Sequence, residues 1–432
     1  MTLRQPPAER TAGSVLLAVA ALSVLAYFPS LQLPFISDDY IQIDLGRKYG
    51  PPAGWWDLFH DALYRCRATS LLLTHWTEQI FGLNPFAFRL TSLAIHIFNA
   101  GLIFALGCWP LIGWRVSAAA ACFFAVYEGH QEAVIWYAAL PELLVFSFSL
   151  LCCLAWVRWI GSNRPLWWAV SLGAFLLALL SKESAVALTP VLAAMLWIEG
   201  KNWRAIGAAV APFAVFSAAY FALAYLSRSN HLHFNDGTFS LHAPFWVPWT
   251  RTIGRLFWFW GAASLILLWR WREAGLTRLL KFTAFWIAFM LLPYCFLTYM
   301  PRVPSRHTYL SAIGVALIAG AAFTAAASRS WQGRAWMVPA LGACVVAHNC
   351  GYLWFVKYRQ YVERAAPTEE LVRHAQRATR PIPLDCFPYS RFVADATLRV
   401  RLGSFPPASW EEQAAAKSGG RCIAKTPASG LD

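Results

Sequence analysis

Two adjacent carboxylates, Asp38 and Asp39, follow the first long apolar run of the chain, in the stretch LPFISDDYIQIDLGRKYG at 33–50. A carboxylate within hydrogen-bond reach of a hydroxyl can remove its proton and act as a general base. The neighbouring acid could orient an acceptor, bind a cation such as Mg²⁺ or Mn²⁺, or change the acidity of the first through like-charge proximity. Because adjacent acids after an apolar run are also common in solvated loops, the pair alone leaves both interpretations open.

Further ionisable groups recur in the later polar segments. Arg and Lys suit a phosphate, because charge-assisted hydrogen bonds stabilise the oxygens that gain charge as a bond breaks. A sugar leaving a phosphate passes through an oxocarbenium-like state, and its transfer to a hydroxyl with inversion needs one base. The combination indicates transfer from an anionic lipid-linked donor, with Asp38 as the base. The residues that could bind the substrates are Arg65, His130, Glu132, Lys182, Glu183, Arg302 and Arg306.

Several of these residues also have a simpler structural interpretation. Lys182 and Glu183 could form a local ion pair in a turn. His130 and Glu132 are two positions apart, so on a regular helix they would face different ways. A polar stripe at helical spacing in the second apolar run is expected to seal a helix bundle through hydrogen bonds rather than to touch substrate. It consists of Arg89, Ser92, His96 and Asn99.

The elements that must position these groups are membrane helices. The chain of 432 residues is 58% hydrophobic and only 13% charged, whereas a soluble domain carries about 25% charged residues. Its apolar runs are roughly 15–22 residues long, the length that spans a bilayer as a helix. They fall at about 13–33, 88–108, 116–128, 142–160, 165–181, 184–199, 205–226, 252–270, 282–300, 308–328 and 335–356. The sequence therefore predicts an all-α polytopic membrane protein, a bundle of about eleven transmembrane helices.

Basic residues mostly flank these runs, which predicts the orientation. Arg4 and Arg10 precede the first run, which we interpret as a retained helix with a cytoplasmic amino terminus. The outer segments are then 34–87, 129–141, 181–184, 227–251, 301–307 and everything after 357. The candidate residues thus gather on one face, expected to be the periplasmic or external face of a bacterial inner membrane. The net charge of +14 is explained by topology and lipid headgroups, so no nucleic-acid partner is expected.

The segment after residue 356 differs from the rest in composition, being polar and rich in Arg and Pro. We therefore divide the chain into a membrane module at 1–356, with the acidic pair in its outer loop 34–87, and a small soluble extension at 357–432. Cys386 and Cys422 lie in this extension, where an oxidising compartment would permit a disulfide between them. No C-x-x-C pair or zinc spacing is present, and any metal requirement stays open.

Four stretches, in the same order, resemble the GT-C superfamily of membrane glycosyltransferases, and most nearly bacterial homologues of the O-mannosyltransferases with transmembrane and tetratricopeptide repeats. The first two are YRCRATSLLLTHWTEQIFGLNPFAFRLTSLAIHIFNAGLIF, similar to YRP…FGLNPFGFHLxNLxLHxxNxxLLF, and FAVYEGHQEAVIWYAALPELL, similar to FxxHPxHxEAVxWxxxRxDLL. The others are LLSKESAVALTPVL, similar to LLSKExAxxLPxxL, and SRHTYLSAIGVAL, similar to ERYLYLPSIGxxL. Together they extend over about residues 1–330.

This resemblance implies a GT-C fold and a polyprenyl-phosphate-linked sugar as the donor. It implies that the first outer loop supplies the catalytic acid, with Asp38 as the base and Asp39 as its partner. It further implies that Arg65, Lys182 and Arg306 are candidates for binding the donor phosphate. His130 and Glu132 would line the same cavity.

The chain departs from the family pattern at several positions. The first histidine and the proline of the second stretch are Tyr127 and Glu128 here, and YRP has become Tyr64-Arg65-Cys66. The basic residue before the fourth apolar run is replaced within Leu140-Pro141-Glu142. These changes leave the sugar and the acceptor open. The extension shows no tetratricopeptide pattern, so a protein acceptor held by such repeats is not expected.

Two other functions are compatible with the residues. A carrier or flippase for an anionic lipid or glycolipid would use the same charges to bind without catalysis. Such transporters often have internal repeats and broken helices at mid-membrane; no repeat is evident here and the charges lie at the outer edge, which favours an enzyme. A non-catalytic scaffold would account for the altered second stretch.

Overall fold

The structure is a computed structural model that describes residues 4–5, 7–230, 238–271, 276–298, 302–329, 336–377 and 387–403. Every apolar run forms helix, and among these residues the β-structure is limited to an isolated bridge between Phe239 and Leu297, so the all-α prediction is confirmed. The helices of the apolar runs are α1 (Glu9–Tyr27), α5 (Pro85–Ala105), α6 (Trp114–Val126), α8 (Leu140–Ser162), α9 (Pro165–Leu179), α10 (Leu188–Ile198), α11 (Trp203–Leu226), α13 (Trp246–Leu256), α14 (Trp260–Trp271), α15 (Leu276–Leu291), α16 (Ala312–Ser328) and α17 (Met337–Gly351).

The chain is a multi-pass membrane protein. In the described segments, six helices are long and apolar enough to cross a bilayer, or seven if α13 and α14, bent by 74°, form one span. Four further apolar helices are shorter: α6, α9, α10 with the turn before it, and α16. The short α16 has buried residues along almost its whole length, because it packs against α6, α14 and α15. The predicted count of eleven transmembrane helices stays a prediction.

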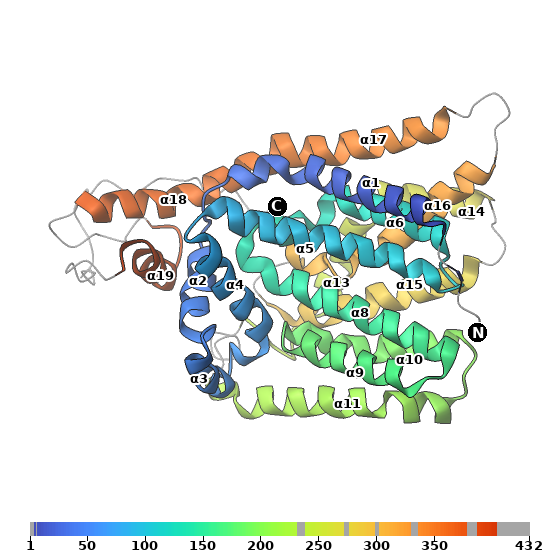
Figure 1. The fold of residues 1–432 in the computed structure, drawn as a ribbon, viewed down its shortest axis with the longest axis horizontal. Helices are drawn as coiled ribbons and strands as arrows, with labels where there is room; N and C mark the ends of the chain where they lie inside the picture. The colour runs from blue at the N-terminus through green and yellow to red at the C-terminus, as the bar shows by residue number, and fades with distance from the viewer. Residues whose placement is uncertain are drawn as a thin grey trace.

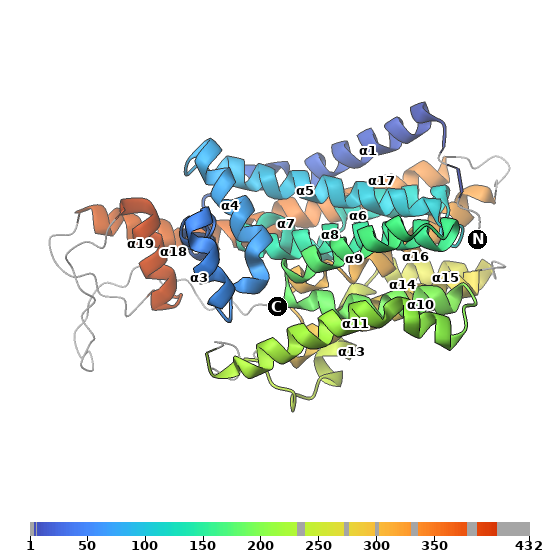
Figure 2. The same cartoon turned by 60° about the horizontal axis from the view of Figure 1, so that its bottom comes forward.

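Successive long helices run back and forth along the same direction (Figure 1), so alternate connections meet at one end of the bundle. That end carries the helices of the first outer loop, α2 (Asp39–Tyr49), α3 (Trp55–His60) and α4 (Ala68–Phe81). It also carries α18 (Tyr358–Arg377) and α19 (Arg391–Leu402). Both helices lie at this end in two views (Figures 1 and 2), and α19 packs on α2. We call it the loop end; the polar segments expected on one membrane face lie here.

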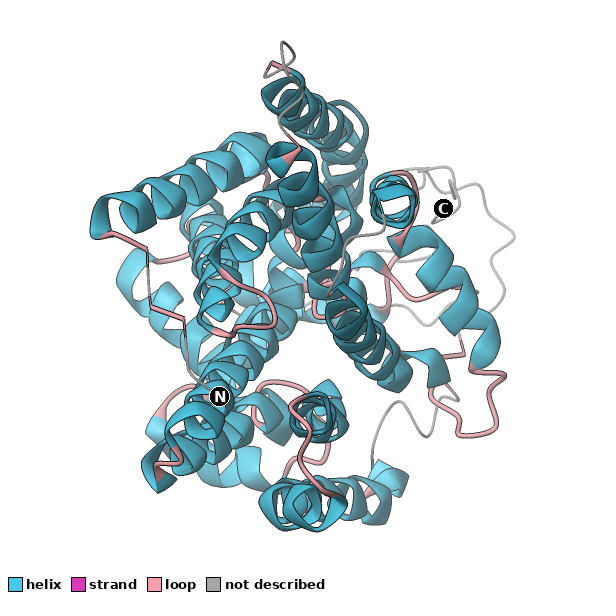
Figure 3. Ribbon diagram, turned by 90° about the vertical axis from the view of Figure 1, so that its right-hand side faces the viewer, coloured by secondary structure: helices cyan, strands magenta, loops and turns pink. Residues whose placement is uncertain are grey.

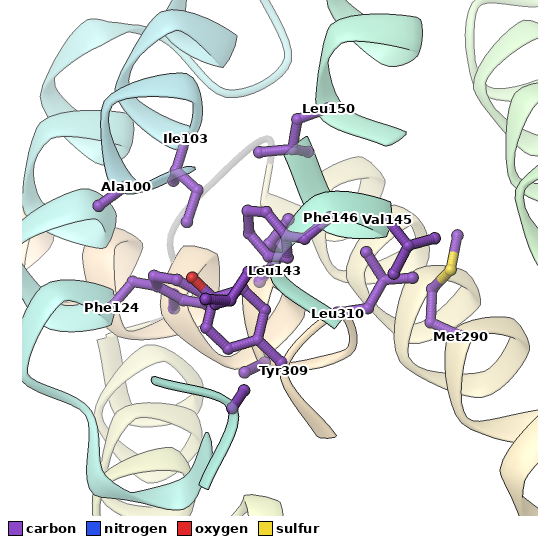
Figure 4. Packing of buried hydrophobic residues seen from close by; sticks show 14 of the residues in the cluster. Ala100, Ile103, Phe124, Leu143, Val145, Phe146, Leu150, Met290, Tyr309 and Leu310 are labelled. Carbon is purple, nitrogen blue, oxygen red and sulfur yellow. The ribbon is translucent and has the colours of Figure 1, made fainter. Parts of the chain in front are cut away.

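Aromatic and aliphatic side chains fill the centre of the bundle, whose helices Figure 3 shows end-on. Phe124, Phe146 and Tyr309 meet there (Figure 4), with ring centroids 4.7–5.1 Å apart. The polar stripe of α5 closes onto this core: His96 Nδ1 lies 2.8 Å from the Tyr309 hydroxyl, and Asn99 Nδ2 donates to Leu143 O. The expectation that this stripe seals the bundle is confirmed for these two residues.

The C-terminal helices continue directly from the last apolar helix. A π-helical turn at Tyr352–Lys357 joins α17 to α18, giving one helical stretch over Met337–Arg377. The helix continues without a break through residue 357. The division of the chain into a membrane module and a soluble extension at that position stays a prediction. Both Cys386 and Cys422 lie outside the described residues, and the disulfide between them stays a prediction as well.

The end of α18 and helix α19 pack on the first outer loop. The Tyr40 hydroxyl donates to Glu369 Oε1 at 3.0 Å, and Arg399 forms an ion pair with Asp44 at 2.8 Å. Leu398 is fully buried in a small apolar cluster against Ile41. The C-terminal helices therefore brace α2, the helix that begins at the acidic pair.

Candidate functional site

A cavity of about 670 Å³ opens at the loop end between the first outer loop and the ends of α8, α10, α11 and α15. Four residues singled out in the sequence line it: Asp38, Lys182, Glu183 and Arg306. Other polar residues of the described chain that line it are Gln42, Tyr64, Arg67, Glu142, Ser184, Tyr220, Tyr294 and His307. Polar residues from seven separate stretches of the sequence thus line one cavity.

Asp38 lines this cavity at the start of α2. The residue before it, Ser37, has a φ of 46°, in the left-handed region that a residue with a side chain adopts only at a cost. The Ser37 hydroxyl donates to Asp38 Oδ1 at 3.0 Å. This turn directs the chain so that Asp38 faces the cavity while its neighbour is turned into the protein.

Asp39 is fully buried and does not line the cavity. Its carboxylate lies 2.8 Å from Arg89 Nη2 and accepts hydrogen bonds from the backbone N–H groups of Ile36 and Ala138, both at 2.8 Å. Arg89 in turn donates to two backbone carbonyls, Pro34 O and Ile135 O. Asp39 therefore ties α2 to α5 and to the start of α8. Its predicted part in catalysis stays a prediction.

The two acids do not share the cavity, because Asp39 is turned toward Arg89 and the backbone N–H groups of Ile36 and Ala138. Within the described ranges, no group of three or more His, Cys, Asp or Glu side chains could hold a metal ion.

Glu142, in the first turn of α8, is the centre of a buried charge cluster in the cavity wall. Its Oε1 accepts a hydrogen bond from Lys182 Nζ and contacts His307 Nδ1, and its Oε2 accepts from the Tyr294 hydroxyl at 2.8 Å. Burial, reinforced by the charge of Lys182, lowers the pKa of His307 to about 3, so the imidazole is neutral near pH 7. Lys182 is thus held by Glu142, 40 positions away in sequence, and not by the adjacent Glu183.

Glu183 faces Arg67, with Oε1 3.9 Å from the guanidinium, and accepts from Cys66 Sγ at 3.2 Å. The Nε of Arg67 is buried and has no hydrogen-bond partner in the described chain. Arg65 points elsewhere: its guanidinium donates to Leu223 O and Ser227 Oγ at the C-terminal end of α11. Arg65 does not line the cavity, so its contact with a donor stays a prediction, and Arg67 lines the cavity instead.

Glu132, His130 and Arg302 do not line the cavity. Glu132 lies 3.2 Å from the guanidinium of Arg306. His130 is packed among the rings of Phe124 and Tyr309 and is fully buried, and its contact with substrate stays a prediction. Arg302 is half-buried outside the lining residues.

The sequence reasoning missed Glu142, Tyr294, Arg67 and His307 as members of the cavity wall. Glu142 had a usable signal, since an acid in the first turn of an otherwise apolar 23-residue helix is costly unless it has a partner. No such sequence signal marks Tyr294, because a single tyrosine near a helix end is normally an interfacial residue.

A pH effect on stability is expected from Glu132. Burial alone would raise the pKa of Glu132, but Arg306 and Arg364 bring it down to about 2. A free Glu titrates at about 4.3, so this group stabilises the folded state above that pH, and the contribution is lost as the pH falls toward 2. Thermal unfolding followed in detergent should show a midpoint that falls more steeply from about pH 5 to pH 3 in the wild type than in Glu132→Gln.

The matched control for this titration is Glu363→Gln, since Glu363 is a half-exposed residue of α18 whose ion pair in the described chain is the i,i+4 pair with Arg359. It should retain the wild-type pH dependence. Equal slopes for the wild type and Glu132→Gln would show that the two guanidiniums do not stabilise the ionised carboxyl.

No protein-family model matches this sequence, and no curated protein matches it. Solved structures do match. The oligosaccharyltransferase of Archaeoglobus fulgidus in its apo form superposes with a TM-score of 0.55 at 12% identity, covering 95% of this chain and 62% of that one. The same enzyme tethered to an acceptor peptide gives 0.53 at 12% identity, covering 86% and 58%. ArnT from Cupriavidus metallidurans bound to undecaprenyl phosphate gives 0.52 at 13% identity, covering 90% and 85%.

Both neighbours are GT-C membrane glycosyltransferases. The chain has the GT-C fold. The fold expected from the four sequence stretches is therefore confirmed. The chain spans about three fifths of the length of the archaeal oligosaccharyltransferase and most of the length of ArnT. At 12–13% identity the likeness extends to the arrangement of the helices, and the GT-C fold by itself does not name the sugar or the acceptor.

Proposed function

We propose that this protein is a membrane glycosyltransferase that moves a sugar from a polyprenyl-phosphate-linked donor to a hydroxyl acceptor on the periplasmic or external face of a bacterial inner membrane. The observation that carries the proposal is that Asp38 lines the same cavity as the basic side chains of Arg67, Lys182 and Arg306. A carboxylate opposite a group of cations matches a reaction that deprotonates one partner and releases a phosphate from the other.

The proposed reaction is a single displacement. The acceptor oxygen attacks the anomeric carbon while Asp38 takes its proton, and the bond from that carbon to the phosphate oxygen breaks. The polyprenyl phosphate leaves with the bonding electrons and one more negative charge, which the basic side chains stabilise. Attack on the side opposite the phosphate inverts the anomeric centre and needs no second carboxylate.

The shape of the cavity supports a lipid-linked donor. Beyond the charged wall it is lined by apolar and aromatic side chains of α11, α15 and the turn after α15. They include Phe221, Phe289, Leu292 and Phe296. A polyprenyl phosphate has an apolar chain joined to one anionic group, and this cavity has an apolar wall adjoining a charged wall, where Arg67, Lys182 and Arg306 supply the positive charges beside Glu142 and Glu183. ArnT, one of the structures with the same fold, is bound to undecaprenyl phosphate.

The test uses purified protein in detergent, radiolabelled polyprenyl-phosphate sugar and a cell-envelope extract as the source of acceptors. We expect label to pass to an acceptor with stoichiometric release of polyprenyl phosphate. In detergent no membrane separates two compartments, so a carrier would have nothing to transport and would leave the donor intact. Donor that binds but stays intact, combined with lipid movement across reconstituted vesicles, would replace the enzyme with the carrier.

Arg67 and Arg65 provide an internal comparison for donor binding. Arg67→Gln removes a guanidinium from the cavity wall, so the dissociation constant for polyprenyl phosphate should rise by about tenfold or more, as loss of one charge-assisted contact predicts. Arg65→Gln should leave it within about twofold, because Arg65 contacts the end of α11 instead. Fluorescence titration with polyprenyl phosphate measures both, and the reverse order of effects would reject the assignment of Arg67.

A further inference from the structure

The imidazole of His307 lies in the cavity wall and is held on two sides. It belongs to the 3₁₀ turn Ser305–Thr308 that precedes α16. Its ring stacks on that of Tyr294, with the centroids 4.5 Å apart and the planes inclined by 17°. Its Nδ1 contacts Oε1 of Glu142. Because the stacked ring and the contact at Nδ1 fix the imidazole, they also fix the direction of its second nitrogen, Nε2.

The contact with Glu142 decides which nitrogen of His307 carries the hydrogen. A carboxylate oxygen only accepts hydrogen bonds, so Nδ1 is the donor to Oε1. Lys182 Nζ, 3.4 Å from Nδ1, donates to the same carboxylate oxygen. Burial and the charge of Lys182 lower the pKa of His307 to about 3, so the ring is neutral near pH 7 and has a single N–H. Nε2 is therefore unprotonated and can only accept a hydrogen bond.

The Nε2 atom of His307 is open to the cavity. Within the described ranges, the side-chain hydrogen bonds of His307 all involve Nδ1. The buried side-chain atoms without a partner in these ranges include both nitrogens of His130 but neither nitrogen of His307. Because Nε2 has no protein partner there and is not enclosed, it reaches the cavity that its residue lines. The wall thus presents a neutral hydrogen-bond acceptor to whatever occupies the cavity.

The phosphate of the donor cannot be the partner of this acceptor. In a polyprenyl-phosphate sugar the phosphate is a diester without an O–H group, so its oxygens only accept, and the polyprenyl chain has no polar hydrogen. The hydroxyls of the sugar can donate. Lys182 and Arg306, two of the basic residues proposed for the phosphate, are neighbours of His307: Lys182 Nζ lies 3.4 Å from Nδ1, and Arg306 precedes His307 in the chain. The sugar hydroxyl nearest to the phosphate is on carbon 2, beside the anomeric carbon.

We propose that His307 is a specificity-determining residue, whose Nε2 accepts a hydrogen bond from the hydroxyl on carbon 2 of the donor sugar. The inference rests on the proposed function, since it takes a polyprenyl-phosphate sugar as the ligand. A hydroxyl at carbon 2 satisfies Nε2 when the donor displaces water from the wall. A 2-deoxy sugar leaves this nitrogen without a partner, and a site built around a hydroxyl rejects an analogue that lacks it.

The experiment measures dissociation constants for the full-length protein in detergent. The probes are polyprenyl phosphate alone and polyprenyl phosphate linked to mannose, glucose or 2-deoxyglucose. Mannose and glucose differ from each other only in the direction of the hydroxyl on carbon 2, and 2-deoxyglucose is the 2-deoxy form of both. The wild type should bind one of the two hydroxylated donors about tenfold or more tightly than the 2-deoxy donor. The mixture contains no acceptor, so the difference arises from the donor sugar.

Two substitutions distinguish the roles of the two nitrogens. His307→Asn places an amide N–H near the position of Nδ1, which keeps the contact with Glu142, and has no atom at the position of Nε2. It should bind the hydroxylated and 2-deoxy donors within about twofold of each other. His307→Gln places an amide oxygen near the position of Nε2 and should retain most of the preference. His374→Asn changes an exposed histidine of α18 and is the control that should bind like the wild type.

The outcomes separate this inference from the proposed function. A wild type that binds polyprenyl phosphate but shows no preference against the 2-deoxy donor overturns the role of His307 alone, and this comparison needs no variant to fold. A preference that persists in His307→Asn overturns it as well. Equal binding of the three sugar donors, combined with slower transfer by His307→Asn, would assign Nε2 to the acceptor hydroxyl instead. A wild type that binds no polyprenyl phosphate overturns both proposals.

Discussion

Asp38→Asn is expected to lower the rate of sugar transfer by about 10²–10⁴-fold, the usual contribution of a positioned general base. The amide keeps the size of the side chain but does not take the acceptor proton at neutral pH. In the described part of the chain, the Asp38 side chain accepts a hydrogen bond from the hydroxyl of Ser37, so the substitution should leave the fold and the affinity for polyprenyl phosphate unchanged. Transfer assays with labelled donor and binding titrations on the same preparation measure both quantities.

The control is Asp57→Asn, which changes an exposed aspartate of α3 in the same outer loop, away from this cavity. It should transfer sugar at the wild-type rate. Turnover of Asp38→Asn equal to that of the control would exclude Asp38 as the base, and loss of donor binding together with turnover would assign it a role in binding instead.

Asp39→Asn should damage the fold rather than the chemistry. The side chains of Asp39 and Arg89 are 0% and 1% exposed, and removing one member of such a buried pair leaves an uncompensated charge, which costs about 3–5 kcal/mol. We expect a much lower thermal-unfolding midpoint and a low yield of folded protein. The fraction that stays folded should bind polyprenyl phosphate with nearly normal affinity, because Asp39 does not face the cavity.

A double variant distinguishes this explanation from general fragility of the loop. Asp39→Asn/Arg89→Gln replaces the ion pair with two neutral amides that can bond to each other, so it should be more stable than Asp39→Asn alone. An Asp39→Asn protein as stable as Asp38→Asn would show that the buried pair contributes little. Of the two adjacent aspartates, Asp38 would then be needed for turnover and Asp39 for folding.

Much of the fold could be predicted from the sequence because a bilayer requires long apolar segments with internally satisfied backbones. The run at 252–270 shows where this reasoning stops. It is mostly apolar and reads as one span, yet the helix breaks after Leu256, and Phe259 adopts a φ of 54° before α14 begins. No proline marks the break, and the single charge beside it, Arg255, does not by itself predict one.

For the site, the sequence indicated residue types but not their partners. Lys182 beside Glu183 suggested a local pair, and the three-dimensional partner is Glu142. Arg65 and Arg67 are two positions apart in one 3₁₀ turn, so a small rotation of the backbone decides which of them faces the cavity. The ion pair between Arg364 and Glu132 could not be predicted from the sequence. Nothing near Glu132 indicates that a helix more than 200 residues downstream packs against it.

The left-handed backbone of Ser37 has a consequence for natural variation at that position. The conformation costs about 1–2 kcal/mol for a residue with a side chain, and this cost is met when the chain folds, before any substrate arrives. The carboxylate of Asp38 is consequently held toward the cavity in advance, so the proposed base does not have to be reoriented when substrate binds. Homologous chains could replace Ser37 with Gly or Asn with little loss of stability. Val or Ile would disfavour this turn and turn the Asp38 carboxylate away from the cavity.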